Sequence, residues 1–147
     1  MNCRYHLVIV AAMAIVTATG CQDAKKAEPT IPPAELGIGP ITAPVTIPTN
    51  IDSALASKGK VVFEAKCTAC HKIEAKYVGP ALGGVTKRRR PEWIMNMILN
   101  PTEMTQKNET AKALLAEYLA QMANQNLTPD EARSVLEYFR QRDSTTP

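Results

Sequence analysis

Aromatic residues, histidines and strand-like patterns are scarce in this chain of 147 residues. Aromatic side chains make up 5% of the sequence, and only two histidines are present. No segment of any length alternates apolar with polar residues, so no sheet is predicted. The composition is otherwise rich in helix-favouring Ala, Lys, Glu, Met and Leu, and the length leaves room for one domain. We therefore expect a small, all-α fold.

A long apolar run is also missing. Arg4 is followed by an uncharged, mostly apolar stretch over residues 7–19, which is shorter than the roughly 20 residues of a membrane-spanning helix. This stretch ends in small residues, as a secretory signal does, and we predict a signal peptide over residues 1–20. Ala18-Thr19-Gly20-Cys21 resembles a bacterial lipobox, which makes Cys21 the expected lipidation site. The alternatives are an ordinary signal with a chance cysteine, or an uncleaved anchor.

Cysteine is too scarce for a disulfide framework. The chain has Cys3, Cys21, Cys67 and Cys70, and only the last two remain free once the signal is removed and Cys21 is acylated. An exported protein that keeps such a pair needs it for redox chemistry or for a covalent cofactor.

The residue after this pair is His71. In Cys67-Thr68-Ala69-Cys70-His71, each thiol can add across a haem vinyl group and the histidine can ligate the iron. A thioredoxin-like motif would need a βαβ setting, and a zinc site would need two further ligands; the sequence offers neither. The motif therefore predicts one covalent haem c, with His71 as an iron ligand.

Proline is concentrated before the predicted domain. Residues 22–50 hold Pro29, Pro32, Pro33, Pro40, Pro44 and Pro48, which argues against a helix or a central strand there. We expect residues 21–50 to be the lipidated cysteine and an extended linker, followed by a domain over residues 51–147. Alternatively, part of the linker lies along the domain surface through its isoleucines and valines.

Four helices are expected in the domain. The first is capped by Ser57 and runs to Cys67, and the second starts at Pro91 and stops at Asn100-Pro101. The third runs from about Glu109 to Met122 on apolar residues spaced by three and four. The fourth begins with a capping box of Thr128 and Glu131 around Pro129 and buries a stripe that ends at Phe139.

With these motifs in place, residues 51–142 resemble a class I cytochrome c. The matching segments are the haem motif, Gly59–Phe63 in the first helix, Val78–Leu82 after the haem motif, and Leu127–Tyr138 in the last helix. The resemblance implies that the Pro80 carbonyl accepts from the ring N–H of His71, although Gly79-Pro80 alone could be a plain turn. It also implies a close crossing of the first and last helices, where Gly59 and Phe63 meet Val135 or Tyr138.

The resemblance further implies a methionine as the second iron ligand, because the other histidine, His6, lies in the predicted signal. Met122 is the first candidate, since it lies shortly before the last helix, where the family places its ligand loop. Met104 is the second candidate. Met95 and Met97, beside Trp93, are expected in the core. Met122 could also belong to the core stripe of the third helix.

Charge is uneven along the domain. Residues 58–90 carry nine basic and two acidic side chains, a net +7, whereas residues 91–147 carry five basic and eight acidic ones, a net −3. Arg90, the last residue of the run Lys87-Arg88-Arg89-Arg90, is expected to neutralise a haem propionate unless the run is a solvated turn. Trp93 either donates its N–H to a propionate or simply packs.

These features favour a single-electron carrier rather than an enzyme. The alternative is a haem enzyme or gas sensor with an exchangeable sixth ligand, but no mature histidine is left for distal acid–base work. We expect a membrane-tethered carrier of a respiratory chain, lipid-anchored on the periplasmic side, that passes electrons to a terminal reductase or oxidase. The expected partners are redox proteins with an acidic docking surface; no nucleic acid and no small-molecule substrate is expected.

Overall fold

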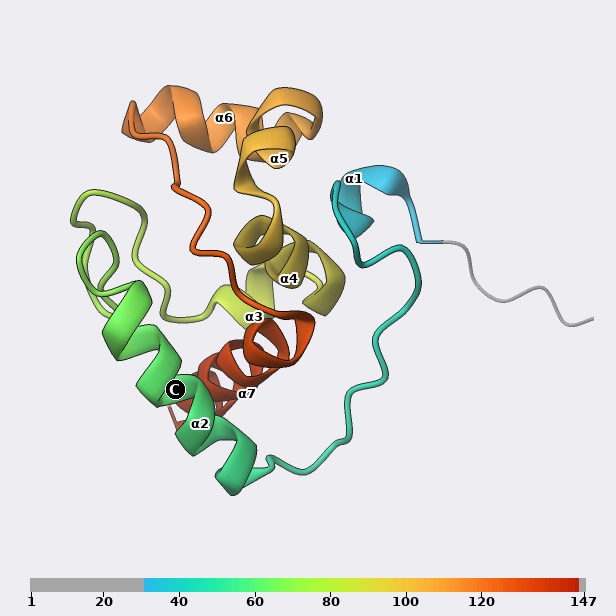
Figure 1. Ribbon diagram of the computed structural model, residues 1–147, viewed down its shortest axis with the longest axis vertical. Coiled ribbons are helices and arrows are strands. Elements are labelled where there is room, and N and C mark those ends of the chain that lie inside the picture. Colours follow the sequence, from blue (N-terminus) through green and yellow to red (C-terminus); the bar gives the residue numbers. More distant parts are fainter. Residues whose placement is uncertain (1–30, 146–147) are drawn as a thin grey trace, which may run out of the picture.

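The structure is a computed structural model that describes residues 31–145, and every regular element in this range is a helix (Figure 1). The predicted all-α fold is therefore confirmed. No helix within these residues is long and apolar enough to cross a membrane. The predicted signal peptide, which contains His6, and the expected lipidation site Cys21 lie outside the described residues. The helices are α1 (Pro33–Leu36), α2 (Ser53–Lys66), α3 (Val85–Arg88), α4 (Pro91–Leu99), α5 (Pro101–Lys107), α6 (Glu109–Tyr118) and α7 (Pro129–Thr145).

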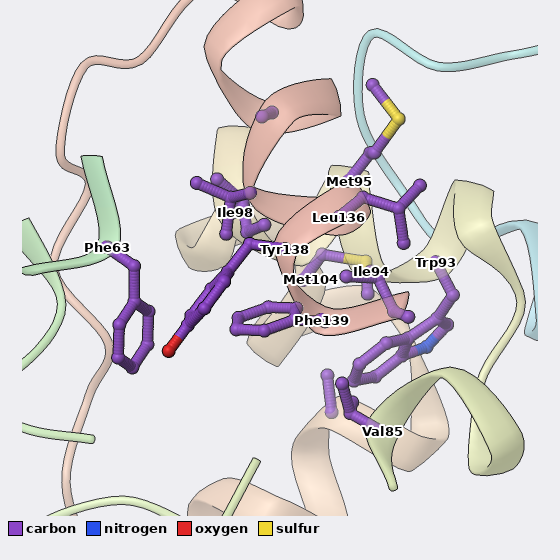
Figure 2. Packing of buried hydrophobic residues seen from close by; sticks show 13 residues of the cluster. Phe63, Val85, Trp93, Ile94, Met95, Ile98, Met104, Leu136, Tyr138 and Phe139 are labelled. Atoms are coloured by element: carbon purple, nitrogen blue, oxygen red, sulfur yellow. The ribbon is translucent and has the colours of Figure 1, made fainter. Parts of the chain in front are cut away.

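Helices α2 and α7 cross at a glycine. A Cβ atom on Gly59 would overlap the carbonyl oxygen of Ser134, so a side chain at this position would keep the two backbones apart. Beside the crossing, the ring of Phe63 lies 5.5 Å from that of Tyr138 and 5.6 Å from that of Phe139, measured between centroids (Figure 2). Aromatic rings at these distances attract one another beyond their buried area. The predicted contact of the first and last helices is confirmed.

The start of α7 was predicted correctly, and the start of α2 was not. The Glu131 amide donates to the Thr128 hydroxyl oxygen (3.2 Å), and the Thr128 amide donates to the Glu131 carboxylate (2.8 Å), which is the expected capping box. Helix α2 begins four residues before the predicted cap, because Asp52 caps it. The Ser57 hydroxyl instead donates to the Ser53 carbonyl inside the helix (2.8 Å).

The segment between α4 and α7 differs from the prediction at two points. Pro101 does not only end α4; it occupies the first turn of a short helix, α5, where its missing N–H is not needed. Helix α6 ends at Tyr118, because Leu119 takes the left-handed conformation (φ 52°). Residues 119–128 are irregular, so Met122 belongs to a loop rather than to a helical stripe.

Residues 33–50 form a strap across the domain, called the N-terminal strap below. Figure 1 shows it passing from α1, next to α4, to the start of α2. Its side chains Ile38, Ile41, Val45 and Ile47 pack against the core, so this part of the predicted linker lies along the domain, and packing starts well before residue 51. The expectation of no helix here was wrong for α1, because Pro33 suits a first helical turn.

Two buried polar side chains of α4 hold the strap. The Asn96 amide accepts from the Ile41 N–H (2.9 Å) and donates to the carbonyl oxygens of Ile41 (2.9 Å) and Leu36 (3.0 Å). The Glu92 carboxylate accepts from the Val45 N–H (2.7 Å). These bonds satisfy backbone groups that an extended segment would otherwise leave unpaired against the protein surface.

Candidate functional site

The Cys-x-x-Cys-His motif follows directly on α2 and borders a cavity. The amides of Cys70 (3.1 Å) and His71 (2.9 Å) both donate to the Cys67 carbonyl, so the chain continues as a turn after the helix. This turn brings the side chains of Cys67, Cys70 and His71 to one end of a cavity of about 550 Å³. The structure therefore places the three predicted haem-attachment residues together.

The walls of the cavity are largely apolar. Helix α4 contributes Trp93, Ile94, Met97 and Ile98, and α7 contributes Val135 and Phe139. Leu114, Leu115 and Tyr118 of α6 and the loop around Met122 form the remaining wall. A volume of this size with few polar groups is typical of a cofactor site.

The ring of His71 is held by the Gly79-Pro80 pair. Its Nδ1 lies 3.2 Å from the Pro80 carbonyl oxygen, the contact that the family resemblance implied. Because a carbonyl can only accept, the neutral ring carries its proton on Nδ1 and keeps the lone pair of Nε2 for a metal. Burial lowers the pKa of His71, against the Pro80 hydrogen bond, which raises it. A Cβ atom on Gly79 would lie 2.5 Å from Cε1 of His71, so the glycine makes room for the ring.

The two cysteines are free thiols in unequal settings: Cys67 is half-buried and Cys70 is exposed. Burial, with a smaller contribution from the charge on Cys70, raises the pKa of Cys67 to about 11. A redox-active Cys-x-x-Cys motif instead needs a thiol whose pKa is lowered. The raised pKa of Cys67 therefore agrees with the sequence argument against a thioredoxin-like role.

The methionines differ in whether they line the cavity. Met122 is half-buried and lines the cavity, whereas Met104 is fully buried, does not line it, and accepts the Ile38 amide on its sulfur (2.9 Å). Met97, which sequence analysis assigned to the core, also lines the cavity from α4, and Met95 does not. The structure thus brings Met122 to the cavity of His71 and keeps Met104 away from it.

Arg90 and the Trp93 N–H both have protein partners in this structure, and of the two roles expected for Trp93 the structure shows packing. Arg90 does not line the cavity, because its guanidinium pairs with the Glu92 carboxylate (3.3 Å). The Trp93 ring does form a wall, but its N–H donates to Oδ1 of Asn108 (3.1 Å) and is not available to a propionate.

Arg88 and Arg89 line the cavity instead. Arg88 donates to the Gly83 carbonyl (2.6 Å), and the Arg89 guanidinium lies 5.3 Å from the centroid of the Trp93 ring. Glu92, two residues after Arg90, was the sequence signal that Arg90 would form an ion pair, unlike Arg88 and Arg89, which line the cavity.

This donor set fits haem c. Two thiols and an oriented imidazole stand at one end of an apolar cavity, and the basic residues Lys66, Lys76, Arg88 and Arg89 are on its border, where they could face propionates. When bound, haem supplies an iron that changes its oxidation state by one electron. In the part of the chain that the structure describes, no three His, Cys, Asp or Glu side chains form a separate metal cluster.

Comparisons with known proteins also indicate a haem c protein. Residues 56–143 match the family model described as cytochrome c. A cytochrome c-553-like protein of Synechocystis sp. is 35% identical over 69 residues, which are 44% of this chain and 66% of that relative. The solved cytochrome c of Rhodothermus marinus is 42% identical, with a TM-score of 0.72 over 77% of this chain and 95% of that one. An engineered form of it is also 42% identical, with a TM-score of 0.71 over 76% and 95%.

The family match covers more than half of the chain, and it contains the haem motif, the His71–Pro80 contact and the α2–α7 crossing. The chain therefore belongs to the cytochrome c family of electron-transfer haem proteins and carries covalently bound haem c.

Proposed function

We propose that this protein is a single-electron carrier rather than a haem enzyme. The observation that carries the proposal is the cavity lining, which contains no aspartate and no glutamate, and whose one histidine is bonded to Pro80. A haem enzyme needs groups that move protons to or from a substrate, and this lining offers no carboxylate and no imidazole other than that of His71 for this work. Spectra of the purified protein test the point: the unmutated, reduced protein is expected not to bind carbon monoxide, and binding would favour an enzyme or gas sensor.

The proposed iron ligands are His71 and Met122. The support is that Met122 borders the same cavity, in a loop free of helical constraints, while the Met104 sulfur is engaged with the strap. Met122→Ala is expected to abolish the sulfur-to-iron charge-transfer band, lower the reduction potential and admit carbon monoxide. Met97→Ala is the matched control, because Met97 is the other methionine in the cavity lining; it should keep the band. The opposite result would transfer the ligand role to Met97.

The proposed partner is a redox protein with an acidic surface that docks at the basic border of the cavity. The Lys72 ammonium lies 5.0 Å from the Tyr77 ring centroid, and the Lys76 ammonium 4.5 Å from that of Tyr118. Tyr77 is 57% exposed, so its ring offers an apolar contact beside the Lys72 charge. Opposite charges raise encounter rates, and salt screens them over about 8 Å at physiological ionic strength.

Electron-transfer rates test this docking surface. The second-order rate with an acidic redox partner should fall as salt is raised, and fall again in Lys72→Glu/Lys76→Glu. Lys60→Glu makes a control, because Lys60 lies within α2 and pairs with Glu64 on the same helix, whereas Lys72 and Lys76 follow the haem motif. A rate that changes neither with salt nor in the Lys72→Glu/Lys76→Glu variant would mean that docking is apolar.

We further propose that Cys21 anchors the protein by lipid on the periplasmic side of a membrane. Trp93, Ile94, Met97 and Ile98 turn one face of α4 to the cavity, while Glu92 and Asn96 hold the strap with another face. A chain that enters along the strap therefore leaves the cavity open to a partner. Cys21→Ser should release a soluble haem protein; a variant that stays in the membrane fraction would contradict the lipid anchor.

The place proposed for this carrier is a respiratory chain, with a terminal reductase or oxidase as acceptor. The support is the family and the expected membrane tether alone. Membranes that contain the reductase should reoxidise the reduced protein when the terminal electron acceptor is added, and should not do so when the reductase is inhibited. Reoxidation that survives inhibition would point to another acceptor.

A further inference from the structure

Asn108, between α5 and α6, is buried and has each of its side-chain polar atoms bonded. It is 3% exposed. Its Oδ1 accepts both from the Ala111 amide (3.1 Å), as an N-cap of α6, and from the Trp93 indole N–H (3.1 Å). Its Nδ2 donates to the Ala34 carbonyl of the strap (3.0 Å). One side chain thus joins α4, α6 and the N-terminal strap.

Two of these partners face the cavity. Trp93 and Ala111 are both in the cavity lining, whereas Asn108 itself is not. The Trp93 ring is held at its edge by Asn108 and lies near the Arg89 guanidinium, which is 5.3 Å from the ring centroid. Without Asn108, a buried indole N–H would lack its acceptor and would draw water or turn toward the cavity.

We propose that Asn108 is a positioning residue that fixes the Trp93 wall of the haem cavity and ties the N-terminal strap to it. By occupying the indole N–H, Asn108 keeps this wall dry and apolar. The hydrophobic shell around a metal centre controls its solvent access and local dielectric, and hence its reduction potential. A dry wall disfavours the more highly charged oxidised iron, so Asn108 raises the potential without touching the haem.

The test uses the full-length, haem-loaded protein and Asn108→Ser. Serine keeps a good N-cap for α6 but is too short to reach Trp93 and Ala34. Because the chain has a single tryptophan, its indole N–H gives one NMR signal whose exchange with solvent reports this bond. We expect exchange to become about tenfold faster, as the loss of one buried hydrogen bond implies, together with a lower reduction potential. Asn108→Asp keeps an acceptor for Trp93 and should restore slow exchange, while its added negative charge favours the oxidised iron and should itself lower the potential.

Two further variants separate positioning from stability. Asp52→Ala removes a capping side chain that does not itself border the cavity, and should leave the potential unchanged. In Trp93→Phe the indole N–H is gone, so adding Asn108→Ser should cause no further fall in potential. The proposal is overturned if Asn108→Ser speeds indole exchange but leaves the potential unchanged, or if Asp52→Ala lowers the potential as much. Only the part of this inference that concerns the reduction potential rests on the proposed carrier function. Carbon monoxide binding by the unmutated protein would contradict the carrier function, but the exchange rate of the indole N–H would still test the role of Asn108.

Discussion

Replacing Glu137 by glutamine should expose how much one buried carboxylate contributes to this fold. Glu137 lies on α7 and is fully buried. Its carboxylate accepts from Arg133 (2.6 Å), from Arg140 (2.7 Å) and from the Asp52 amide at the start of α2 (3.0 Å). Arg140 also donates to the Pro48 carbonyl of the strap (2.6 Å). The substitution therefore acts on the junction of α7, α2 and the strap.

The expected loss is about 3 kcal/mol at pH 7. Removing one partner of a buried ion pair typically costs about 3–5 kcal/mol, and glutamine keeps one acceptor oxygen, which places the loss at the lower end. The arginines are 20% and 14% exposed, so solvent screens the pairs only weakly. With a urea dependence of about 1.5 kcal/mol per molar, the unfolding midpoint should fall by about 2 M.

The pH dependence of this loss has a definite sign. Burial alone would raise the pKa of Glu137, but the hydrogen bonds from Arg133, the Asp52 amide and Arg140 outweigh it, and the pKa is lowered. A carboxylate of this kind stabilises the fold fully above its unfolded pKa of about 4.3. The stabilisation is lost as the pH falls through the lower, folded value. The difference between the unmutated protein and Glu137→Gln should therefore shrink as urea titrations are repeated at decreasing pH.

Glu103→Gln is the control, because Glu103 also pairs with a basic residue, Lys107, but on the exposed side of α5. Its urea midpoint should stay near that of the unmutated protein. A loss below about 0.5 kcal/mol in Glu137→Gln at pH 7, or a difference that grows toward low pH, would refute the reasoning, since a partnered buried charge predicts neither.

Three further substitutions follow from the geometry. Gly59→Ala should destabilise the domain by about 3 kcal/mol in urea titrations, because the added methyl would overlap a backbone oxygen of α7, which cannot turn aside. Gly79→Ala would place a methyl against the His71 ring, so the haem spectrum should change even where the protein still folds. Asp143→Asn should cost about 1–2 kcal/mol in thermal unfolding, since the buried carboxylate accepts from two backbone amides at the start of α3; an unchanged midpoint would contradict that.

Features encoded within a few residues could be predicted from the sequence. The capping box of Thr128 and Glu131 and the haem motif are both complete within five residues, and the structure places each as expected. The start of α2 was not predicted correctly, because Asp52 and Ser57 are both residues that can cap a helix. Asp52 does so in the structure, and its amide donates to Glu137 of α7, a contact that the local sequence does not reveal.

Features that depend on distant partners could not be predicted. The Trp93 N–H was expected to donate to a propionate unless the ring simply packed, and nothing near it in sequence pointed to Asn108, fifteen residues on. The linker offered proline and isoleucine, which suit an extended spacer and a packed strap equally well. Asn96, which decides between them, lies fifty-five residues after Ile41.

The side-chain anchors of the strap also bear on the order of folding. Its hydrogen bonds join residues that are 47 (Val45 and Glu92), 66 (Ile38 and Met104) and 92 (Pro48 and Arg140) positions apart. Closing loops of this length costs entropy before any contact repays it, so the strap should dock after α4, α5 and α7 have assembled. Bonds that end on single side chains, rather than in a helical ladder, can also open together without unfolding the rest. In a chain made from its N-terminus, the strap is synthesised before the helices that it fastens to and is the last to find its place.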